Sequence, residues 1–376
     1  KGHQGGPAMS SIKYTSEMFD AMGRDNLLEL FESNKIGIFY HIKMKKDDAV
    51  SIFQPALLSS FLKIVYHVKT IKPTASRSKA DMYRYDYDQG KYVPNAKTFF
   101  TELIKKWWGD KYLSISKSKI WDDLSAQTYI DRKEFDFDPN YILVSNCIIH
   151  LKHDSKWRYE ILENSPDYLI LSRIPTTYDP TATAPRFLQF LSEILPDQQK
   201  NIDLIQEYVG YCLYRAWIYD LALMFIGTGD NGKTTLISTI RVMLGAENTT
   251  EIDLYKITRG SWYTAELWQK LANLGDDISD TDLKYTGMFK KITGGARIMG
   301  ERKFRDPFYF EPYAKHIWPA NRLPNTPDES DAFFRRWGPI EFHQNFEFDS
   351  RRDPNLIKKL TTPQELSGIL NWALKG

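Results

Sequence analysis

The chain has 376 residues, of which 42% are hydrophobic, 14% aromatic and 26% charged, and its formal net charge is +2. This composition excludes a disordered or fibrous protein, and the length predicts two or three domains. The small net charge means that nucleic-acid binding would need a local basic patch, and no apolar run approaches the roughly 18 residues of a membrane span.

The residues at the two ends of the chain lead to two expectations. Residues 1–10, KGHQGGPAMS, are rich in glycine, place a Gly-Pro pair ahead of Met9 and resemble a cloning scar. The last residues, ILNWALKG, have the pattern of an amphipathic helix. We therefore expect a fragment of a longer protein.

Apolar spacing and turn residues predict the elements of the first half. Residues 11–72 are predicted to be mostly helical, because LLELFES and PALLSSFLKIVYHV repeat apolar residues every three or four positions. Alternating aromatic and polar residues predict a hairpin over 83–92, and a helix follows in AKTFFTELIKKWWG. The stretch 141–172 returns to strand-like runs, YILVSNCIIHL and YLILSRI.

The pattern changes in the second half. The Pro- and Thr-rich stretch 175–185 is predicted to be a linker. Two helices are expected up to residue 217, after which strand, loop and helix alternate as in an α/β sheet. Cys147 and Cys212 stand in apolar or aromatic surroundings, which favours two buried thiols and a reducing compartment.

Two Asp-x-Asp pairs resemble the metal-binding pairs of polymerases and primases. Asp86 and Asp88 fall on the predicted hairpin, and Asp136 and Asp138 precede a Pro-Asn turn signal. Neither pair has a third acid or a histidine in a convincing pattern nearby. We predict turn residues, and we expect a primase domain or protein, if there is one, upstream of this chain.

The stretch GTGDNGKT matches the pattern G-x-x-x-x-G-K-T. It follows LALMFI, a run suited to a buried parallel strand, and precedes TLISTIRVML, an amphipathic helix. In this context backbone N–H groups and a helix N-terminus bind phosphate, the lysine reaches the β- and γ-phosphates, and the threonine binds Mg²⁺. The predicted nucleotide-binding residues are Gly227, Thr228, Gly229, Asp230, Asn231, Gly232, Lys233, Thr234 and Thr235.

A phosphate loop of this kind needs an acid on a neighbouring strand to hold Mg²⁺ and polarise water. Asp276 and Asp277 end a short apolar run that Asn273 interrupts. Alternatively, the acids and Ser279 only cap a helix over TDLKYTGMFKKI, and both roles can coexist if Asp280 or Ser279 caps. Spacing does not separate Asp276 from Asp277.

Three polar residues further on are also candidates for the site. HIWPAN ends at Asn321, whose amide at a strand end could position the attacking water, although such an Asn is often a turn residue. Arg335 and Arg336 follow a short helix. They are either a solvated pair or an arginine finger that reaches the site of a neighbouring copy.

A charged hairpin is predicted over IMGERKFRDPFYF, with Phe308 and Phe310 alternating after a turn at Asp306-Pro307. Its cations could contact phosphates and an aromatic ring could stack on a base. The alternative is an ordinary charged hairpin. The predicted DNA-binding residues are Lys290, Lys291, Arg302, Lys303, Phe304 and Arg305.

Taken in chain order, these motifs are similar to those of the superfamily 3 helicases of the phage/plasmid primase–helicase type. The resemblance rests on GTGDNGKT, GDD, FKKITGG, ERKFRDPFYF, AKHIWPANRLPN and DAFFRRWGPIEF and covers residues 140–376 at least. It implies an α/β fold, an AAA+ type P-loop ATPase core with a central parallel sheet, preceded by a mixed α+β, mostly helical amino-terminal domain.

The resemblance also implies function. It predicts a hexameric ring that uses ATP and Mg²⁺ to move along single-stranded or forked DNA in the cytoplasm of a bacterial or archaeal host or of a virus-infected cell. Lys233 and Thr234 would bind ATP and Mg²⁺, Asp277 with Asp276 would be the Walker B acid, Asn321 the sensor, and Arg335 or Arg336 the finger. The hairpin would project into the channel.

The domains that follow from this resemblance are a cloning scar at 1–10, an amino-terminal α+β helper domain at 11–174, a linker and helical segment at 175–217, and the superfamily 3 ATPase/helicase domain at 218–376. Three departures stand out. Ala296 follows the glycine pair where the family usually has an acid, Pro319 lies within the sensor strand, and the Walker B acids are Asp-Asp.

Two other functions are compatible with the same motifs. One is an ATP-driven protein remodeller, and the other is a DNA-binding or origin-recognition module that binds ATP only to assemble. The basic hairpin favours a motor over a remodeller. The combination of Lys233, Asp277, Asn321 and an arginine favours hydrolysis over assembly alone.

Overall fold

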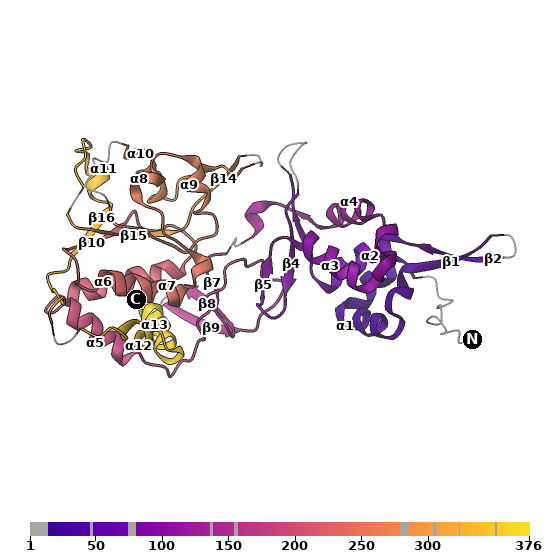
Figure 1. The fold of residues 1–376 in the computed structure, drawn as a ribbon, viewed down its shortest axis with the longest axis horizontal. Coiled ribbons are helices and arrows are strands. Elements are labelled where there is room, and N and C mark those ends of the chain that lie inside the picture. The colour runs from indigo at the N-terminus through magenta and orange to yellow at the C-terminus, as the bar shows by residue number, and fades with distance from the viewer. Residues whose placement is uncertain are drawn as a thin grey trace. The chain divides into compact units, whose positions relative to one another are not determined.

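The computed structural model describes residues 14–45, 48–73, 80–135, 138–153, 157–278, 285–303, 307–322, 324–349 and 352–376. The chain divides into two compact units, Lys1–Phe135 and Asp136–Gly376 (Figure 1). The boundaries expected from the sequence at 174/175 and 217/218 both fall inside the second unit. As domain limits they stay predictions.

The first unit is built from four helices around an aromatic core. The helices are α1 (Ser16–Asn34), α2 (Pro55–Val65), α3 (Ala96–Trp108) and α4 (Lys117–Thr128), with short 3-10 turns at Lys35–Phe39, Gly109–Ser114 and Arg132–Glu134. Their inner faces bury residues such as Phe61 and Phe100. The helical prediction for 11–72 is confirmed for α1 and α2.

Strands that the sequence pattern did not reveal also belong to this unit. β1 (Tyr40–Lys45) and β2 (Asp48–Phe53) form an antiparallel ribbon between α1 and α2. Its apolar side chains Ile42, Val50 and Ile52 are about half exposed, so the ribbon lacks the buried face that produces a clear alternation. A second sheet has the order β5-β4-β3-β6, formed by Lys91–Val93, Met82–Asp86, Lys69–Ile71 and Tyr129–Ile130. Of these strands, only β3 and β6 were not predicted.

The predicted hairpin over 83–92 is confirmed by the antiparallel pairing of β4 with β5. The carboxylate of Asp86 accepts the backbone N–H groups of Asp88 and Gln89, both at 3.1 Å, and that of Asp138 accepts the N–H of Asn140 at 2.9 Å. Asp86 and Asp138 thus have the turn-forming roles that were predicted for them. Asp136 lies outside the described residues.

The second unit begins with a small antiparallel sheet of β7 (Tyr141–Leu143), β8 (Ile148–His153) and β9 (Trp157–Leu162). The prediction of a strand at YLILSRI is wrong, because residues 168–174 form no strand. Ile170, Leu171 and Ile174 are buried, but this segment makes only single contacts, such as the Ile174 N–H to Leu143 O bond of 2.9 Å. The segment is apolar because it is buried, although it does not pair with a strand.

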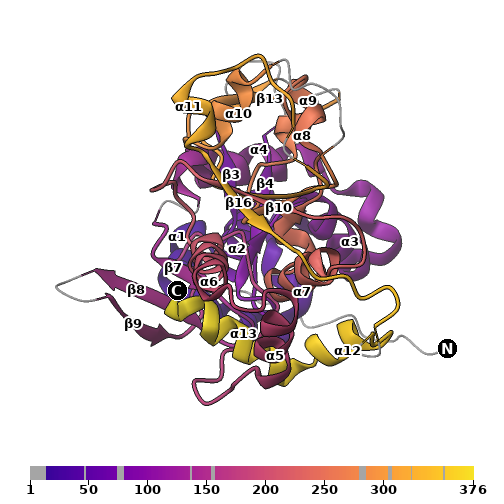
Figure 2. The same ribbon diagram turned by 90° about the vertical axis from the view of Figure 1, so that its left-hand side faces the viewer.

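The large sheet of the second unit has five parallel strands in the order β11-β12-β15-β10-β16. Figures 1 and 2 show helices α5, α6, α7, α12 and α13 on one face, and α8 to α11 with the β13–β14 hairpin on the other. The strands are β10 (Ala222–Ile226), β11 (Thr249–Thr250), β12 (Ala272–Leu274), β15 (Lys315–Ala320) and β16 (Trp337–Glu341).

The remaining elements of this unit precede, connect or follow these strands. The helices are α5 (Pro185–Ile194), α6 (Gln199–Leu213), α7 (Lys233–Leu244), α8 (Leu254–Ile257), α9 (Ser261–Ala265), α10 (Gly287–Ile292), α11 (Asp331–Phe334), α12 (Leu356–Leu360) and α13 (Pro363–Lys375), with a 3-10 turn at Ala246–Asn248. The hairpin consists of β13 (Ile298–Gly300) and β14 (Phe308–Phe310), which confirms the prediction for that stretch.

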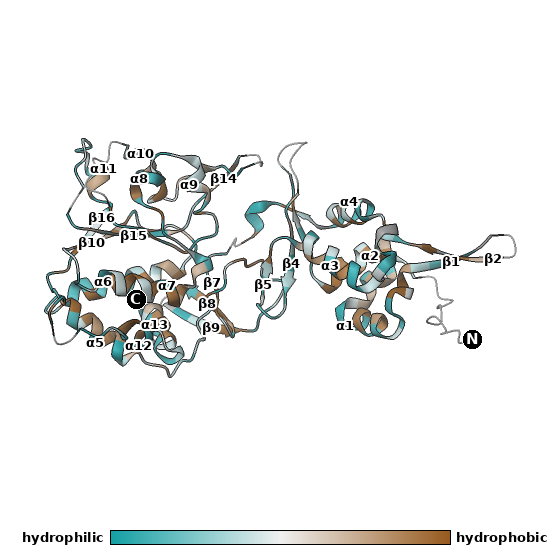
Figure 3. Cartoon of the chain, viewed as in Figure 1, coloured by the Kyte–Doolittle hydropathy of each residue, from teal (hydrophilic) through white to brown (hydrophobic). Residues whose placement is uncertain are grey.

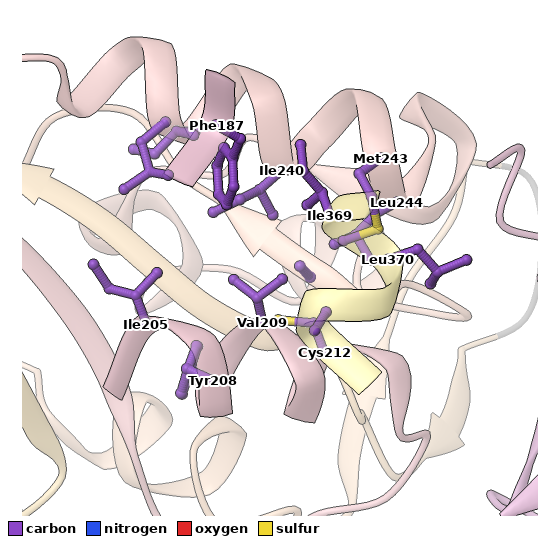
Figure 4. Packing of buried hydrophobic residues seen from close by; sticks show 14 of the residues in the cluster. Phe187, Ile205, Tyr208, Val209, Cys212, Ile240, Met243, Leu244, Ile369 and Leu370 are labelled. Atoms are coloured by element: carbon purple, nitrogen blue, oxygen red, sulfur yellow. The ribbon is translucent and has the colours of Figure 1, made fainter. Parts of the chain in front are cut away.

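One core joins the sheet to the helices below it. Figure 4 shows Ile205, Val209 and Cys212 of α6 facing Ile240 and Met243 of α7, together with Ile369 and Leu370 of α13. In Figure 3, α5 carries both hydrophobic and hydrophilic stretches, as an amphipathic helix does. Cys147 and Cys212 are buried free thiols.

The segment 175–184 is tied to this core. Thr176 donates a hydrogen bond to Met243 O at 2.8 Å, and Asn146 bonds the backbone of Tyr178 at 2.9 and 3.0 Å. At its end the buried carboxylate of Glu365, from α13, accepts the N–H groups of Arg186 and Phe187 at 3.1 and 3.0 Å. Glu365 therefore caps the N-terminus of α5, and the two helices are fixed to each other.

No helix within the described part of the chain has both the length and the apolar character that crossing a membrane requires.

Candidate nucleotide-binding site

The glycine loop connects the end of β10 at Ile226 to the start of α7 at Lys233. Gly232 has φ of +89°, and a Cβ atom there would lie 2.5 Å from Cγ2 of Ile194. A Cβ on Gly227 would lie 2.6 Å from the carbonyl oxygen of Phe342. Both positions therefore require glycine, and the loop is packed directly against α5 and the segment after β16.

Lys233 is buried, with 6% of its surface exposed. Its Nζ donates to the carbonyl of Gly227 at 2.6 Å and to Oδ1 of Asn231 at 3.0 Å. Burial lowers the pKa of this lysine, and the negative charge of Asp277 partly opposes the shift. The ammonium is thus already curled over the loop, where it could exchange these carbonyl contacts for phosphate oxygens.

A pocket of about 370 Å³ opens above the loop. The predicted residues that line it are Gly229, Asp230, Asn231, Gly232, Lys233, Thr234, Thr235, Asp277 and Asn321. Predicted residues that do not line it are Gly227, Thr228, Asp276, Arg335 and Arg336. The structure therefore separates the two acids that spacing could not, because only Asp277 lines the pocket.

Strand order explains why these residues meet. The expectation that the acidic strand is next to the phosphate-loop strand is wrong, because β15 lies between β10 and β12. The three strands end at the same edge of the sheet, where Gly227 N–H donates to Ala320 O at 3.0 Å. Asn321 follows Ala320 directly, so it lies between the loop and Asp277. Ligands bind at this edge in open parallel sheets.

A bulge in the chain after β12 turns the acids outward. Gly275 N–H donates to Ile317 O and Ile278 N–H to Pro319 O, both at 2.9 Å. The chain advances three residues from Gly275 to Ile278 while β15 advances two, from Ile317 to Pro319. This one-residue bulge leaves Asp276 and Asp277 exposed. A Cβ on Gly275 would lie 2.3 Å from the Trp318 ring, so glycine is required before the acids.

The same region shows how two residues that are unusual in strands, Asn273 and Pro319, are accommodated in β12 and β15. Asn273 does not interrupt β12, because its buried amide bonds Thr250 Oγ1 at 2.6 Å and both the N–H and C=O of Ile252 at 2.8 and 2.9 Å. Pro319 does not shorten β15, which runs to Ala320. The carbonyl of Pro319 accepts the N–H of Ile278 on the side where the chain bulges, and the missing N–H of the proline falls on this side as well.

The helix expected over TDLKYTGMFKKI begins later than predicted. α10 starts at Gly287 with Thr286 as its N-cap, and Tyr285 is not helical. Ser279 and Asp280, the alternative capping residues, lie outside the described residues.

The two arginines have different environments. Arg336 is buried, its Nη2 is 2.7 Å from Oδ2 of Asp220, and its carbonyl accepts the N–H of Ala222 at 2.7 Å. It therefore holds β16 against the start of β10. Arg335, the preceding residue, is exposed. Of the two, Arg335 has the accessibility that contact with another copy of the chain would require.

The predicted DNA-binding residues are distributed over α10 and the hairpin. Lys290 pairs with Asp328 at 2.7 Å and holds the pKa of that carboxyl well below its usual range. Lys291 and Lys303 are exposed, and the Arg302 guanidinium lies 5.2 Å from the ring centroid of Phe308. Phe304 and Arg305 lie outside the described residues.

The aromatic residue exposed on the hairpin is Tyr309, which was not among the predicted DNA-binding residues. Phe310 is buried, and the rings of Phe308 and Phe310 both contact Trp268. Tyr309 points the other way, is 57% exposed, and has the guanidinium of Arg297 at 4.9 Å from its ring centroid. The period of two along FYF could have indicated it.

One half of the pocket was not expected from the sequence. Its apolar wall combines α5 with the segment from residue 346 to α12, and these residues lack any motif. The apolar lining residues are Phe190, Ile194, Phe346, Pro354, Leu356 and Ile357, and the charged ones are Glu193, Arg352 and Asp353. Only the fold brings elements more than 150 residues apart in the sequence to one wall.

Two family models match the chain. A family of unknown function, DUF5906, matches residues 225–336, which include the glycine loop, the acids, the hairpin and both arginines. A model described as D5 N terminal like matches residues 74–196.

A comparison with curated proteins finds a helicase relative. A relative from Acanthamoeba polyphaga mimivirus, described as "Putative helicase L207/L206", is 27% identical over 170 residues, which are 42% of this chain and 17% of that protein. The chain thus spans a small part of that relative.

Among solved structures, the apo structure of the NrS-1 C-terminal region (305–718) shares the fold with a TM-score of 0.55 at 11% identity, covering 82% of this chain and 66% of that one. A second apo form of the region gives a TM-score of 0.54, also at 11% identity, over 81% of this chain and 66% of that one. The D5 N-terminal-like match, the helicase relative and the fold shared with the NrS-1 region together support the resemblance to phage-type primase–helicases.

Proposed function

We propose that the second unit is an AAA+ type P-loop ATPase core that binds ATP with Mg²⁺. The observation that carries this proposal is the convergence of Lys233, Asp277 and Asn321 on one pocket at the carboxyl edge of three adjacent parallel strands. Each supplies a group that phosphoryl transfer needs: a cation for phosphate, a carboxylate, and an amide that can orient water.

The residues of the pocket suggest how the nucleotide is oriented. Backbone N–H groups of the loop and Lys233 would hold the phosphates at the N-terminus of α7. The hydroxyl of Thr234 and the carboxylate of Asp277 are the hard oxygen ligands that Mg²⁺ accepts beside phosphate and water. The apolar wall made by Phe190, Ile194 and α12 would then receive the base.

We further propose that this ATPase is a DNA helicase motor for replication of a phage, plasmid or other mobile element. The exposed Lys303 and Tyr309 with Arg302 on the β13–β14 hairpin support single-strand binding, because cations contact phosphates and a ring stacks on bases. The exposed Arg335 supports a ring, usually of six copies in the family that the sequence resembles, in which one copy completes the site of the next.

ATP hydrolysis with and without single-stranded DNA tests the proposal. A motor should hydrolyse ATP and be stimulated by DNA, and K233A should abolish both. Hydrolysis that DNA does not stimulate at any salt concentration would favour a remodeller. Binding of ATP without hydrolysis would favour an assembly module.

A further inference from the structure

Two of the acids that line the pocket, Glu193 and Asp353, are each paired with a cation. Glu193 lies 3.2 Å from the guanidinium of Arg186 and accepts from Gln189 at 2.8 Å. Asp353 pairs with Lys359 at 2.7 Å, and this hydrogen bond lowers the pKa of its carboxyl. These cations are therefore committed to their acids, and they do not line the pocket.

Arg352 is different because it lines the pocket and is held loosely. Its Nη1 donates to the carbonyl of Glu347 at 3.0 Å, and its Nη2 lies 3.8 Å from Oδ1 of Asp230. The side chains of Arg352 and Asp230 are 60% and 48% exposed, and an ion pair this exposed contributes little to stability. A guanidinium has five N–H groups, so most of them remain available for another acceptor.

The segment that carries Arg352 is tied to the phosphate loop by its backbone. Phe342 N–H donates to Ile226 O, and Phe346 N–H donates to Asp230 O, both at 2.8 Å. Asp230 itself has φ of 54°, in the left-handed region. The carboxyl-terminal segment is thus bonded to the end of β10 and to the middle of the loop, and Arg352, six residues after Phe346, lines the pocket.

The charge of Asp230 needs an explanation if the pocket takes a nucleoside triphosphate. A carboxylate in the loop would repel the phosphates unless a cation accompanies it. Arg352 is that cation, and a polyphosphate offers it a more highly charged and bidentate acceptor than one exposed carboxylate does.

We propose that Arg352 is a phosphate-binding residue, supplied by the carboxyl-terminal segment of the same chain and held beside the loop by Asp230 until phosphate displaces the carboxylate. This inference rests on the proposed function, because it assumes that the pocket binds a triphosphate. It adds a second cation, after Lys233, to the phosphate end of the site.

Binding of ATP and of inorganic tripolyphosphate, each with Mg²⁺, to the full chain tests this by calorimetry. The variants are R352Q, D230N, the double variant and K233A. K358Q is the matched control, because Lys358 is an exposed cation on the adjacent α12 that does not line the pocket. All the substituted side chains except Lys233 are exposed, and thermal melting would verify that each variant folds.

We expect R352Q to weaken binding of both ligands about tenfold or more, as for loss of a charged hydrogen bond. The loss should have the same size in the D230N background, while K358Q should bind like the wild type. The proposal is overturned if R352Q binds like the wild type, if its loss disappears in the D230N background, or if K358Q loses as much. If K233A binds both ligands as tightly as the wild type, the nucleotide site itself is refuted.

Discussion

Asp276 and Asp277 are adjacent in the sequence but differ in what they can reach, because only Asp277 lines the pocket. We expect D277N to lower the rate of ATP hydrolysis by about a hundredfold or more, as for loss of a group that positions metal and water. D276N should stay within a few-fold of the wild type. Steady-state hydrolysis with ATP in excess measures both, and equal losses in the two variants would contradict the assignment.

We expect Lys315 to make the stability of the protein depend on pH. It is fully buried, and its Nζ donates to the carbonyls of Ala216 and Tyr313 at 2.8 and 3.0 Å and also to Tyr214 O. Burial lowers its pKa to about 7, whereas the unfolded chain keeps this proton up to about pH 10. Above pH 7 the folded protein therefore binds fewer protons than the unfolded one, and stability should rise with pH.

The measurement is the free energy of unfolding in urea at about pH 6.5, 8 and 9.5, for the wild type and K315M. The difference between the two should grow in favour of the wild type over this range. A difference that does not change with pH would show that the lysine titrates alike in both states.

At the scale of elements, the β13–β14 hairpin should bind single-stranded DNA through its exposed face. We expect R302A/K303A to weaken binding and to reduce the dependence on salt by about 0.7 for each lost phosphate contact. Y309A should weaken binding by about 1–3 kcal/mol with little change in salt dependence, because stacking is not ionic. Fluorescence anisotropy at several salt concentrations measures both, with K200A, an exposed cation on α6, as the control.

The cap that Glu365 forms on α5 should matter for stability. E365A removes the acceptor of two N–H groups at the helix N-terminus, and we expect a loss of about 1–2 kcal/mol. E266A, at an exposed position, should cost much less. Chemical unfolding of both variants measures this loss. Equal stabilities of the two variants would show that Glu365 does not help to hold α5 in place.

Local patterns predicted elements well where one face is buried. The α2 and α3 helices, the β4–β5 hairpin and the strand–loop–helix around Lys233 all follow from apolar spacing or glycine. The β1–β2 ribbon was missed because its apolar residues are exposed, and YLILSRI was wrongly predicted as a strand because it is buried without a partner. Hydrophobic periodicity indicates which side chains are buried, but it does not indicate which strands pair.

At the scale of the whole molecule, the question is whether one copy completes the site of another. R335A lacks the proposed finger and K233A lacks the proposed phosphate cation, so each should hydrolyse little ATP alone. Mixing them should restore part of the activity, because some interfaces then combine an intact finger with an intact pocket. R336A should instead destabilise the fold, since Arg336 is buried against Asp220.

Activity of the mixture as a function of total protein concentration is the measurement. Mixing R335A with wild-type protein is the control. A mixture no more active than its components would show that Arg335 does not act between copies.

The sequence predicted the polar half of the candidate site and missed the other half. Glycines, Lys233 and Asp277 carry a motif because phosphate chemistry restricts the residue types. Phe190, Leu356 and Ile357 have no motif, because any apolar residue would serve and their proximity depends on α5 meeting α12. The strand β15 was expected from HIWPAN, but its place between β10 and β12 was not, since strand order is a property of long-range topology.

That central strand has a mechanical consequence. β15 starts at Lys315, which is anchored to carbonyls after α6, and ends at Ala320, directly before Asn321 of the pocket. The hairpin strand β14 ends at Phe310, so only residues 311–314 separate it from β15. A tether this short spans at most about 14 Å and has little slack. If the pocket binds a nucleotide as proposed, a displacement of β15 on binding would therefore be transmitted to the hairpin through this short connection.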